Sequence, residues 1–255
     1  MGIFKNICVV IPTFNEAENI STLIAEIFAL PLEGLNVLVV DDNSPDGTGD
    51  IVNSLRKEDP DRISIIRRGK KNGLGTAYIT GFQQALVKGH DAIIQMDADF
   101  SHPPEKILEL MEKLNLSDVA IGSRYIPGGS LDVQWPLWRK SLSVFGNLYA
   151  KIILRLPVND ATGGFRAWRR ETLLGMPLER VRSNGYAFQV EMIYLANKLG
   201  YSILEVPFYF ADRQWGNSKM SLKIQYEAAY RVWQMIYEYR DLKSLHRSES
   251  DPLVM

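Results

Sequence analysis

The sequence predicts an α/β protein built on a mostly parallel sheet flanked by helices. Short apolar runs rich in β-branched residues recur through the first half of the chain, and each run is continuous rather than alternating. A helix-like segment separates each run from the next. Continuous runs are typical of strands covered on both faces, and strands that alternate with helices form parallel sheets.

The expected strands lie at residues 7–11, 37–40, 63–66, 92–96 and 119–121. We expect helices to start at Glu16, Asp46, Gly75 and Pro104, each soon after a strand end and each preceded by residues that favour a helix N-terminus. Ligands bind at the carboxyl ends of the strands in such sheets. Polar residues that follow a strand are therefore the first candidates for a functional site.

The second half of the chain has a different pattern. The tryptophan-containing segment 135–140 leads into an amphipathic stretch over residues 142–156, and residues 221–239 form a second such stretch. Two interpretations of the first stretch stay open: a helix packed on the sheet, or a helix in a membrane interface with tryptophans at headgroup depth and cations outward. We expect one catalytic domain over residues 1–243 and a polar, disordered tail over 244–255.

Composition bounds the class of protein. The 255 residues, 46% of them hydrophobic, can bury one substantial core. The 29 basic and 30 acidic side chains nearly cancel, which argues against nucleic acid as a partner. A single cysteine, Cys8, excludes an intramolecular disulfide and fits a reducing, cytoplasmic setting. No segment reaches the roughly 20 apolar residues that span a bilayer, so we expect peripheral contact with the cytoplasmic face of a membrane at most.

The acidic residues Asp97 and Asp99 directly follow the fourth expected strand, with Ala98 between them. Two carboxylates at the rim of a sheet can hold Mg²⁺ or Mn²⁺ against a diphosphate. An acidic pair after a strand is more often ordinary turn chemistry, so the neighbouring motifs decide its meaning.

Those motifs form an ordered series: IPTFNE at 11–16, VDDNSPDGT at 40–48, GLG at 73–75, MDADFSHP at 96–103, GSRY at 122–125, DATGGFR at 160–166, GYAFQVEM at 185–192 and RQWGNSK at 213–219. The series resembles the dolichol-phosphate (polyprenol-phosphate) mannosyltransferases, inverting glycosyltransferases with the A-type nucleotide-sugar fold. The resemblance runs from about residue 7 to residue 219, and it covers both halves of the chain.

The resemblance implies roles for matching residues. The base and ribose pocket is Pro12, Phe14, Glu16, Val40 and Asp42. Asp97, Ala98 and Asp99 hold the metal and the diphosphate, with Ser101 or water as a third ligand. Arg124, Arg213 and Lys219 contact phosphate oxygens of the nucleotide sugar. The catalytic residues are then Asp97, Asp99 and Arg124.

The implied acceptor is a polyprenyl or dolichyl phosphate held by Arg124, Arg139 and Ser143. Such a monophosphate is already anionic and needs no general base to attack an anomeric carbon. We therefore expect His102 to support the loop beside the metal motif, and Glu191 to orient a neighbouring arginine rather than to act as a base.

The implied reaction transfers mannose from GDP-mannose to the lipid phosphate, with a membrane-protein subunit as a possible partner. A UDP-glucose-dependent enzyme with the same acceptor is the first alternative, and a noncatalytic lipid-phosphate-binding subunit is the second. A dinucleotide-binding oxidoreductase is disfavoured, because Gly73-Leu74-Gly75 lacks the third glycine and follows the third expected strand rather than the first.

Overall fold

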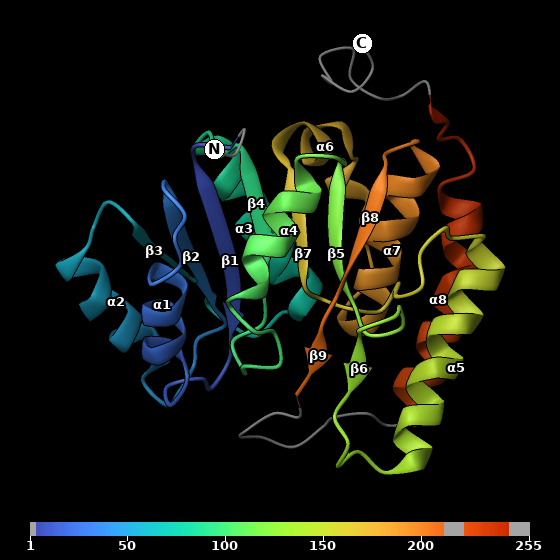
Figure 1. Cartoon of the computed structure of the whole chain (residues 1–255), viewed down its shortest axis with the longest axis horizontal. Coiled ribbons are helices and arrows are strands. Elements are labelled where there is room, and N and C mark those ends of the chain that lie inside the picture. Colours follow the sequence, from blue (N-terminus) through green and yellow to red (C-terminus); the bar gives the residue numbers. More distant parts are fainter. Residues whose placement is uncertain (1–3, 212–221, 245–255) are drawn as a thin grey trace.

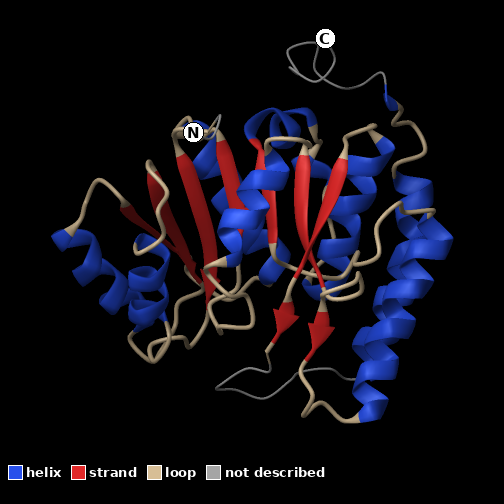
Figure 2. Ribbon diagram, in the orientation of Figure 1, coloured by secondary structure: helices blue, strands red, loops and turns tan. Residues whose placement is uncertain are grey.

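The computed structural model describes residues 4–211 and 222–244 of the chain. A seven-stranded sheet forms its centre, and helices cover both faces (Figures 1 and 2). The strand order is β3-β2-β1-β4-β7-β5-β8, with every neighbouring pair parallel except the two that involve β7. The prediction of a mostly parallel α/β sheet is confirmed.

The strands are β1 (Ile7–Thr13), β2 (Leu35–Asp41), β3 (Ile63–Arg67), β4 (Ala92–Gln95), β5 (Val119–Ser123), β7 (Arg166–Arg169) and β8 (Ile203–Pro207). The short strands β6 (Ser130–Leu131) and β9 (Tyr209–Phe210) pair in a second, two-stranded sheet. All five strands expected from apolar runs are present, whereas β7 and β8 were not predicted.

The helices are α1 (Ile20–Phe28), α2 (Thr48–Glu58), α3 (Leu74–Val87), α4 (Lys106–Leu114), α5 (Leu137–Leu154), α6 (Arg170–Gly175), α7 (Gly185–Lys198) and α8 (Leu222–Glu238), with a 3₁₀ turn at Leu178–Arg180. Alternate residues of each strand point into two cores. In β1, Val9 packs with α1 and α4 on one face, while Cys8 and Val10 pack with α3 and α7 on the other. Cys8 is 1% exposed, so this thiol is a small residue of the core.

Three of the four expected helix starts were two to four residues early. The backbone at Asn15 is left-handed, with φ of 63°, and a turn precedes the first residue of α1. Asp46 accepts hydrogen bonds from the main-chain nitrogen and the hydroxyl of Thr48, so it lies in the turn before α2, whose N-cap is Gly47. Tandem prolines delay α4 to Lys106, because a proline ring offers no N–H to continue a turn.

The amphipathic stretches form α5 and α8, which lie side by side at the outer edge of the molecule (Figure 1). Their contact includes the Trp233 indole, which donates to the Tyr149 hydroxyl at 2.8 Å. α5 begins at Leu137, earlier than expected. Within the described ranges, no helix combines the length and the apolar character needed to cross a bilayer.

The solvent side of this helix pair carries a set of exposed apolar side chains, here called the outer apolar face: Leu137, Trp138, Val144, Phe145, Leu148 and Ile152 on α5 and Tyr230, Trp233, Ile236 and Tyr237 on α8. Trp135 does not belong to it. This tryptophan is only 7% exposed and packs edge-on to Phe210 with 5.7 Å between ring centroids, so of the two open interpretations its burial favours packing within the protein.

Candidate active site

The candidate site lies where the parallel strands of the sheet end. Because β1, β2 and β4 are parallel, the segments that follow them lie at one edge of the sheet, and the first two are joined directly. The Thr13 hydroxyl at the end of β1 donates to Asp41 at the end of β2 at 3.0 Å, and the main-chain nitrogen of Glu16 donates to Thr48 Oγ1 at 2.9 Å. β4, which pairs with β1, brings the acidic motif to the same edge of the sheet.

Hydroxyl groups fix both carboxylates of the acidic motif. The Tyr78 hydroxyl on α3 donates to Asp97 Oδ1 at 2.6 Å, and the Ser101 hydroxyl donates to Asp99 Oδ1 at 2.6 Å. Burial, together with the charge of Asp97, raises the pKa of Tyr78 well above its ordinary value. The tyrosine therefore stays protonated and keeps its role as a donor across the physiological range.

His102 supports the loop that carries the acidic motif, as expected. Its Nδ1 accepts a hydrogen bond from the main-chain nitrogen of Asp97 at 3.0 Å. The ring is 1% exposed and stacks on Phe165 with 4.9 Å between centroids and an interplanar angle of 8°. The contact anchors the start of the motif to the core beneath β7, which limits how far the loop can move.

The residues fit a divalent cation as two oxygen ligands rather than as a complete cage. Asp97 is half-buried and has no cationic partner in the part of the chain that the structure describes. Across the same residues no group of three or more His, Cys, Asp and Glu side chains could hold a metal. Mg²⁺ and Mn²⁺ accept substrate oxygens as ligands, so such a pair suits a metal that arrives with a diphosphate. The Ser101 hydroxyl donates to Asp99, and its role as a third ligand stays a prediction.

The expected nucleotide pocket contains an arginine that the sequence analysis missed. Arg68 forms an ion pair with Asp42, and its Nη1 donates to Thr76 Oγ1 at 2.7 Å. It also reaches the carbonyl of Gly73 at 3.2 Å, so it links the ends of β2 and β3 to the start of α3. Asp42 is therefore already paired with the Arg68 guanidinium within the site.

The other pocket residues surround this pair to different depths. Lys71 lies over the Phe14 ring at 3.6 Å from its centroid, and Glu16 accepts a hydrogen bond from the Asn19 amide at 2.9 Å. Pro12 is half-buried at the end of β1. Val40 is fully buried among the core residues, so a role in binding a base stays a prediction.

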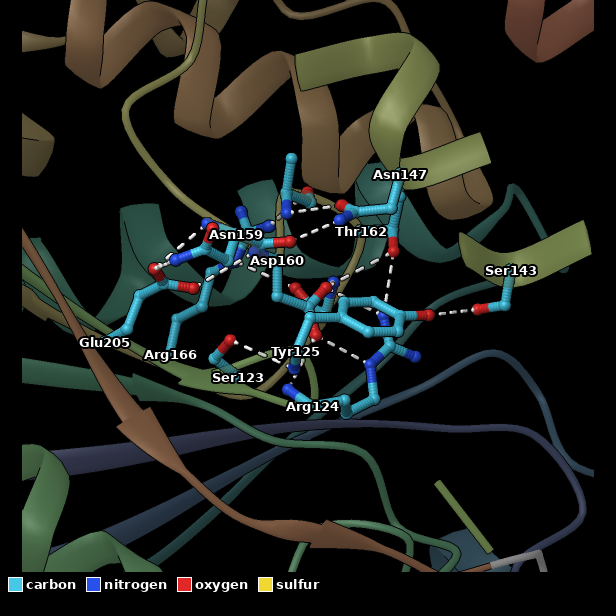
Figure 3. Close-up of polar contacts among 12 residues, drawn as sticks. Ser123, Arg124, Tyr125, Ser143, Asn147, Asn159, Asp160, Thr162, Arg166 and Glu205 are labelled. Carbon is cyan, nitrogen blue, oxygen red and sulfur yellow. Dashed lines mark hydrogen bonds and ion pairs between the residues drawn. The ribbon is translucent and has the colours of Figure 1, made fainter. Parts of the chain in front are cut away.

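Arg124 follows β5 and forms a buried ion pair with Asp160 (Figure 3). Its Nε and Nη2 donate to the two carboxylate oxygens at 2.7 and 2.8 Å, and Nη2 also reaches Thr162 Oγ1 at 2.8 Å. Burial by itself lowers the pKa of Arg124, but the Asp160 carboxylate overrides that effect and raises it. The guanidinium is thus permanently charged, and its Nη1 makes no hydrogen bond in the described structure.

The loop that carries Asp160 is held from both sides. Glu205 on β8 accepts hydrogen bonds from the main-chain nitrogens of Asn159 and Asp160 at 2.9 and 3.0 Å. Asn147 on α5 accepts from the nitrogen of Ala161 at 2.8 Å. Beneath the loop, the buried Arg166 donates to the carbonyl of Gly163 at 3.0 Å (Figure 3). α5 is therefore joined directly to the Arg124 site.

The two other expected acceptor residues also lie on α5. The Ser143 hydroxyl is 2.7 Å from the Tyr125 hydroxyl, next to Arg124 (Figure 3). The Arg139 guanidinium lies 3.6 Å above the Trp135 ring. Arg213 and Lys219, the remaining expected cations, lie outside the described residues, as do residues 245–255 of the tail expected over 244–255.

Glu191 behaves as the sequence analysis expected. It is fully buried and forms a 2.9 Å ion pair with Arg231 on α8. It also accepts from the Tyr239 hydroxyl at 2.7 Å and from the nitrogen of Ser183 at 2.8 Å. The carboxylate therefore orients an arginine, as predicted, and joins α8 to α7, whereas the expectation that it does not act as a base stays a prediction.

Fold and site together define a class of enzyme. A mostly parallel sheet that places an Asp-x-Asp motif and a buried arginine at the ends of its strands is the arrangement of a glycosyltransferase with the A-type nucleotide-sugar fold. Residues 8–174 match the Glycosyl transferase family 2. The chain belongs to this family.

Its curated relatives carry more specific names. The chain is 43% identical over 237 residues to an undecaprenyl-phosphate mannosyltransferase of Micrococcus luteus, which covers 92% of this chain and 96% of the relative. It is 42% identical over 226 residues to a polyprenol monophosphomannose synthase of Mycolicibacterium smegmatis, covering 88% and 84%. A dolichol-phosphate mannosyltransferase of Pyrococcus furiosus is 37% identical over 235 residues, covering 90% of this chain and 63% of the relative.

Solved structures support the fold alone. A glucosyl-3-phosphoglycerate synthase from Mycobacterium tuberculosis, in complex with Mn²⁺ and UDP-glucose, aligns with a TM-score of 0.63 at 19% identity, covering 92% of this chain and 79% of its own. A mannosyl-3-phosphoglycerate synthase from Rubrobacter xylanophilus aligns with a TM-score of 0.63 at 21% identity, covering 98% and 79%.

Proposed function

We propose that this protein transfers mannose from GDP-mannose to a polyprenyl or dolichyl phosphate, with inversion, giving polyprenyl β-mannosyl phosphate and GDP. The observation that carries the proposal is the pair of carboxylates, Asp97 and Asp99, fixed by hydroxyl donors at the strand-end rim where Arg124 also lies. The names of the curated relatives support mannose as the sugar and a polyprenyl phosphate as the acceptor.

In this proposal the donor is held along the ends of β1, β2 and β4. Phe14 offers an aromatic face to the base, and the paired Asp42 and Arg68 offer an acceptor and donors for the base and ribose. Asp97 and Asp99 hold Mg²⁺ or Mn²⁺, which when bound neutralises charge on the departing diphosphate. Arg213 and Lys219 supply further cations to the phosphates.

The acceptor is its own nucleophile. A lipid monophosphate is anionic near neutral pH, so its oxygen can attack the anomeric carbon of the donor without a general base. Arg124 presents Nη1 to that phosphate, while its other nitrogens are held by Asp160 and Thr162. Arg139 and Ser143 on α5 complete the acceptor site, so the protein contributes mainly alignment and charge.

We further propose that the outer apolar face contacts the cytoplasmic face of a membrane. Six apolar side chains of α5 recur at helical spacing along one exposed stripe, and the neighbouring stripe of α8 is rich in aromatic residues. Such faces bind at the boundary between headgroups and acyl chains. A lipid acceptor would then enter next to Ser143 and Arg139, and a membrane-protein subunit is the alternative occupant of this surface.

A paired-donor assay tests the proposed function. The protein is incubated with polyprenyl phosphate, Mg²⁺ or Mn²⁺, and labelled GDP-mannose or labelled UDP-glucose, and label is counted in the organic extract. Label from GDP-mannose alone supports the proposal. Label from UDP-glucose alone replaces mannose by glucose. Lipid binding without turnover of either donor indicates a noncatalytic subunit.

A further inference from the structure

A chain of three buried side chains crosses the core and ends at the candidate site. The Trp168 indole nitrogen on β7 donates to Gln95 Oε1 on β4 at 3.4 Å. Gln95 Nε2 in turn donates to Gln189 Oε1 on α7 at 2.6 Å. Trp168 and Gln95 are fully buried, and Gln189 is 3% exposed.

This series of hydrogen bonds determines which end of each amide side chain is the hydrogen-bond donor. An indole nitrogen can only donate, so the Gln95 atom that faces Trp168 must be its carbonyl oxygen. The Gln95 nitrogen then faces Gln189, whose carbonyl oxygen must accept. The remaining end of Gln189 is therefore its NH₂ group, and the assignment follows from the partners of the two amides.

The NH₂ group of Gln189 lies beside the acidic motif. A methyl group placed on Gly164 would sit 3.2 Å from Gln189 Nε2 and 3.7 Å from Asp97 Oδ2. It would also lie 3.4 Å from His102 Cε1, so three side chains surround this one point. Gly164 and Asp97 are both half-buried, so the point lies at the wall of the site rather than in the core.

Within the described structure Gln189 Nε2 donates no hydrogen bond to a protein group. The residue is 3% exposed and this nitrogen keeps some contact with solvent, so its hydrogen is open to a ligand at the wall of the site. A ligand oxygen that replaces water there would accept a hydrogen bond from an amide whose direction is already fixed. Because Gln189 lies beside Asp97, the nucleotide sugar is the natural source of an oxygen that accepts this hydrogen bond.

We infer that Gln189 is a specificity-determining residue that donates a hydrogen bond to a hydroxyl of the donor sugar. The inference rests on the proposed function, in which Asp97 helps to hold the sugar diphosphate. A carboxamide is neutral, so it suits a sugar hydroxyl better than a phosphate, which recruits arginine, lysine and metal. Gln95 is the positioning residue, because its hydrogen bond fixes the direction of the Gln189 amide.

Variants at position 189 test whether the side chain contacts the sugar rather than the nucleotide of GDP-mannose. Gln189→Leu removes the side-chain NH₂ group without adding charge. Gln189→Glu also removes it but keeps an oxygen that can accept the hydrogen bond from Gln95. We expect both to lower kcat/KM for GDP-mannose about 10-fold to 100-fold, while the affinity of Gln189→Leu for GDP alone stays within about twofold of wild type. Gln83→Glu, on the exposed side of α3, is the matched control for added charge.

Deoxy donors apply the same test to the wild-type protein. GDP-mannose analogues that each lack one hydroxyl are compared in wild type and in both variants. One analogue should react more slowly with wild type by the factor that Gln189→Leu loses on GDP-mannose, and Gln189→Leu should lose nothing further with it.

Two outcomes would overturn the inference in a protein that transfers mannose. One is a folded Gln189→Leu or Gln189→Glu variant with kcat/KM within about twofold of wild type. The other is that every deoxy analogue of GDP-mannose lowers kcat/KM by the same factor in the variants as in wild type. Failure of wild type to use GDP-mannose would instead contradict the proposed function, so the two failures are distinct.

Discussion

Arg124 and Asp160 form a buried bidentate ion pair, with 2.7 Å from Nε to one carboxylate oxygen and 2.8 Å from Nη2 to the other. The pair joins the residue after β5 to the loop that precedes β7. Burial by itself raises the pKa of Asp160, but the charge and hydrogen bonds of Arg124 hold it below its ordinary value. Asp160 thus holds Nε and Nη2 of Arg124, and Nη1 is the nitrogen left to contact a ligand.

Asp160→Asn should destabilise the protein more than it lowers the affinity for GDP. The change removes one charge of a buried pair and leaves Arg124 uncompensated, which costs about 3–5 kcal/mol. Urea unfolding of the variant measures the loss. Asp50→Asn, which breaks the exposed Arg67–Asp50 pair, is the control and should change stability by less than about 1 kcal/mol. Equal effects at the two positions would contradict a structural role for the buried pair.

Asp97→Asn and Asp99→Asn should each abolish mannose transfer while leaving the fold intact. Each variant keeps the size of the side chain but removes the anionic oxygens that a divalent cation requires. Transfer is measured with and without a chelator, and unfolding is followed by circular dichroism. Substantial activity of wild type under chelation, or of either variant with metal present, would rule out the metal role.

Charge on the outer apolar face should abolish binding to vesicles without abolishing chemistry. Each buried apolar side chain of this size contributes about 1.5–3 kcal/mol, so Phe145→Asp with Ile152→Asp should lower partitioning more than tenfold. Co-sedimentation with phospholipid vesicles that contain polyprenyl phosphate measures it. Val87→Asp is the control, because Val87 is 81% exposed at the end of α3, away from this face. Unchanged sedimentation of the double variant would refute the proposed membrane contact.

The stability of the protein should fall as pH rises from about 9 toward 12, partly because of Cys8. Burial raises the pKa of this thiol to about 12. The unfolded chain then loses the thiol proton before the folded chain does, so the contribution is complete below the unfolded pKa and is lost above it. The slope from one such group reaches about 1.4 kcal/mol per pH unit. Cys8→Ala should show a shallower decline in urea unfolding across this window, and an identical slope would contradict the assignment.

The first half of the fold was predictable because its strands are buried on both faces and therefore leave uninterrupted apolar runs. β7 leaves no such signal, since its sequence is Arg-Ala-Trp-Arg. It can be buried because main-chain carbonyls of neighbouring loops accept the guanidinium protons: Arg169 donates to the carbonyls of Leu114 and Ser117, and Arg166 to that of Gly163. The partners of Arg169 lie 52 and 55 residues away in the sequence, so a local pattern cannot reveal them.

The site, like the fold, was predictable only where local sequence patterns reveal it. Motifs at strand ends identified Asp97, Asp99 and Arg124, but the residues that fix them come from other elements. Tyr78 lies within α3, where an aromatic residue at helical spacing is typical of the core. Asp160 lies in a loop near no expected strand. Only the packing of α3 on β4 and of the loop against β5 shows that these side chains hold the site together.

Inverting transfer to a lipid phosphate is tested by the balance of products when purified protein acts on labelled GDP-mannose and polyprenyl phosphate with Mg²⁺ or Mn²⁺. We expect one GDP to be released for each mannose that enters the organic phase, with the sugar attached to the lipid phosphate in the β configuration. Release of GDP with free mannose in the aqueous phase, or an α-linked product, would contradict the claim that this site performs inverting transfer to a lipid phosphate.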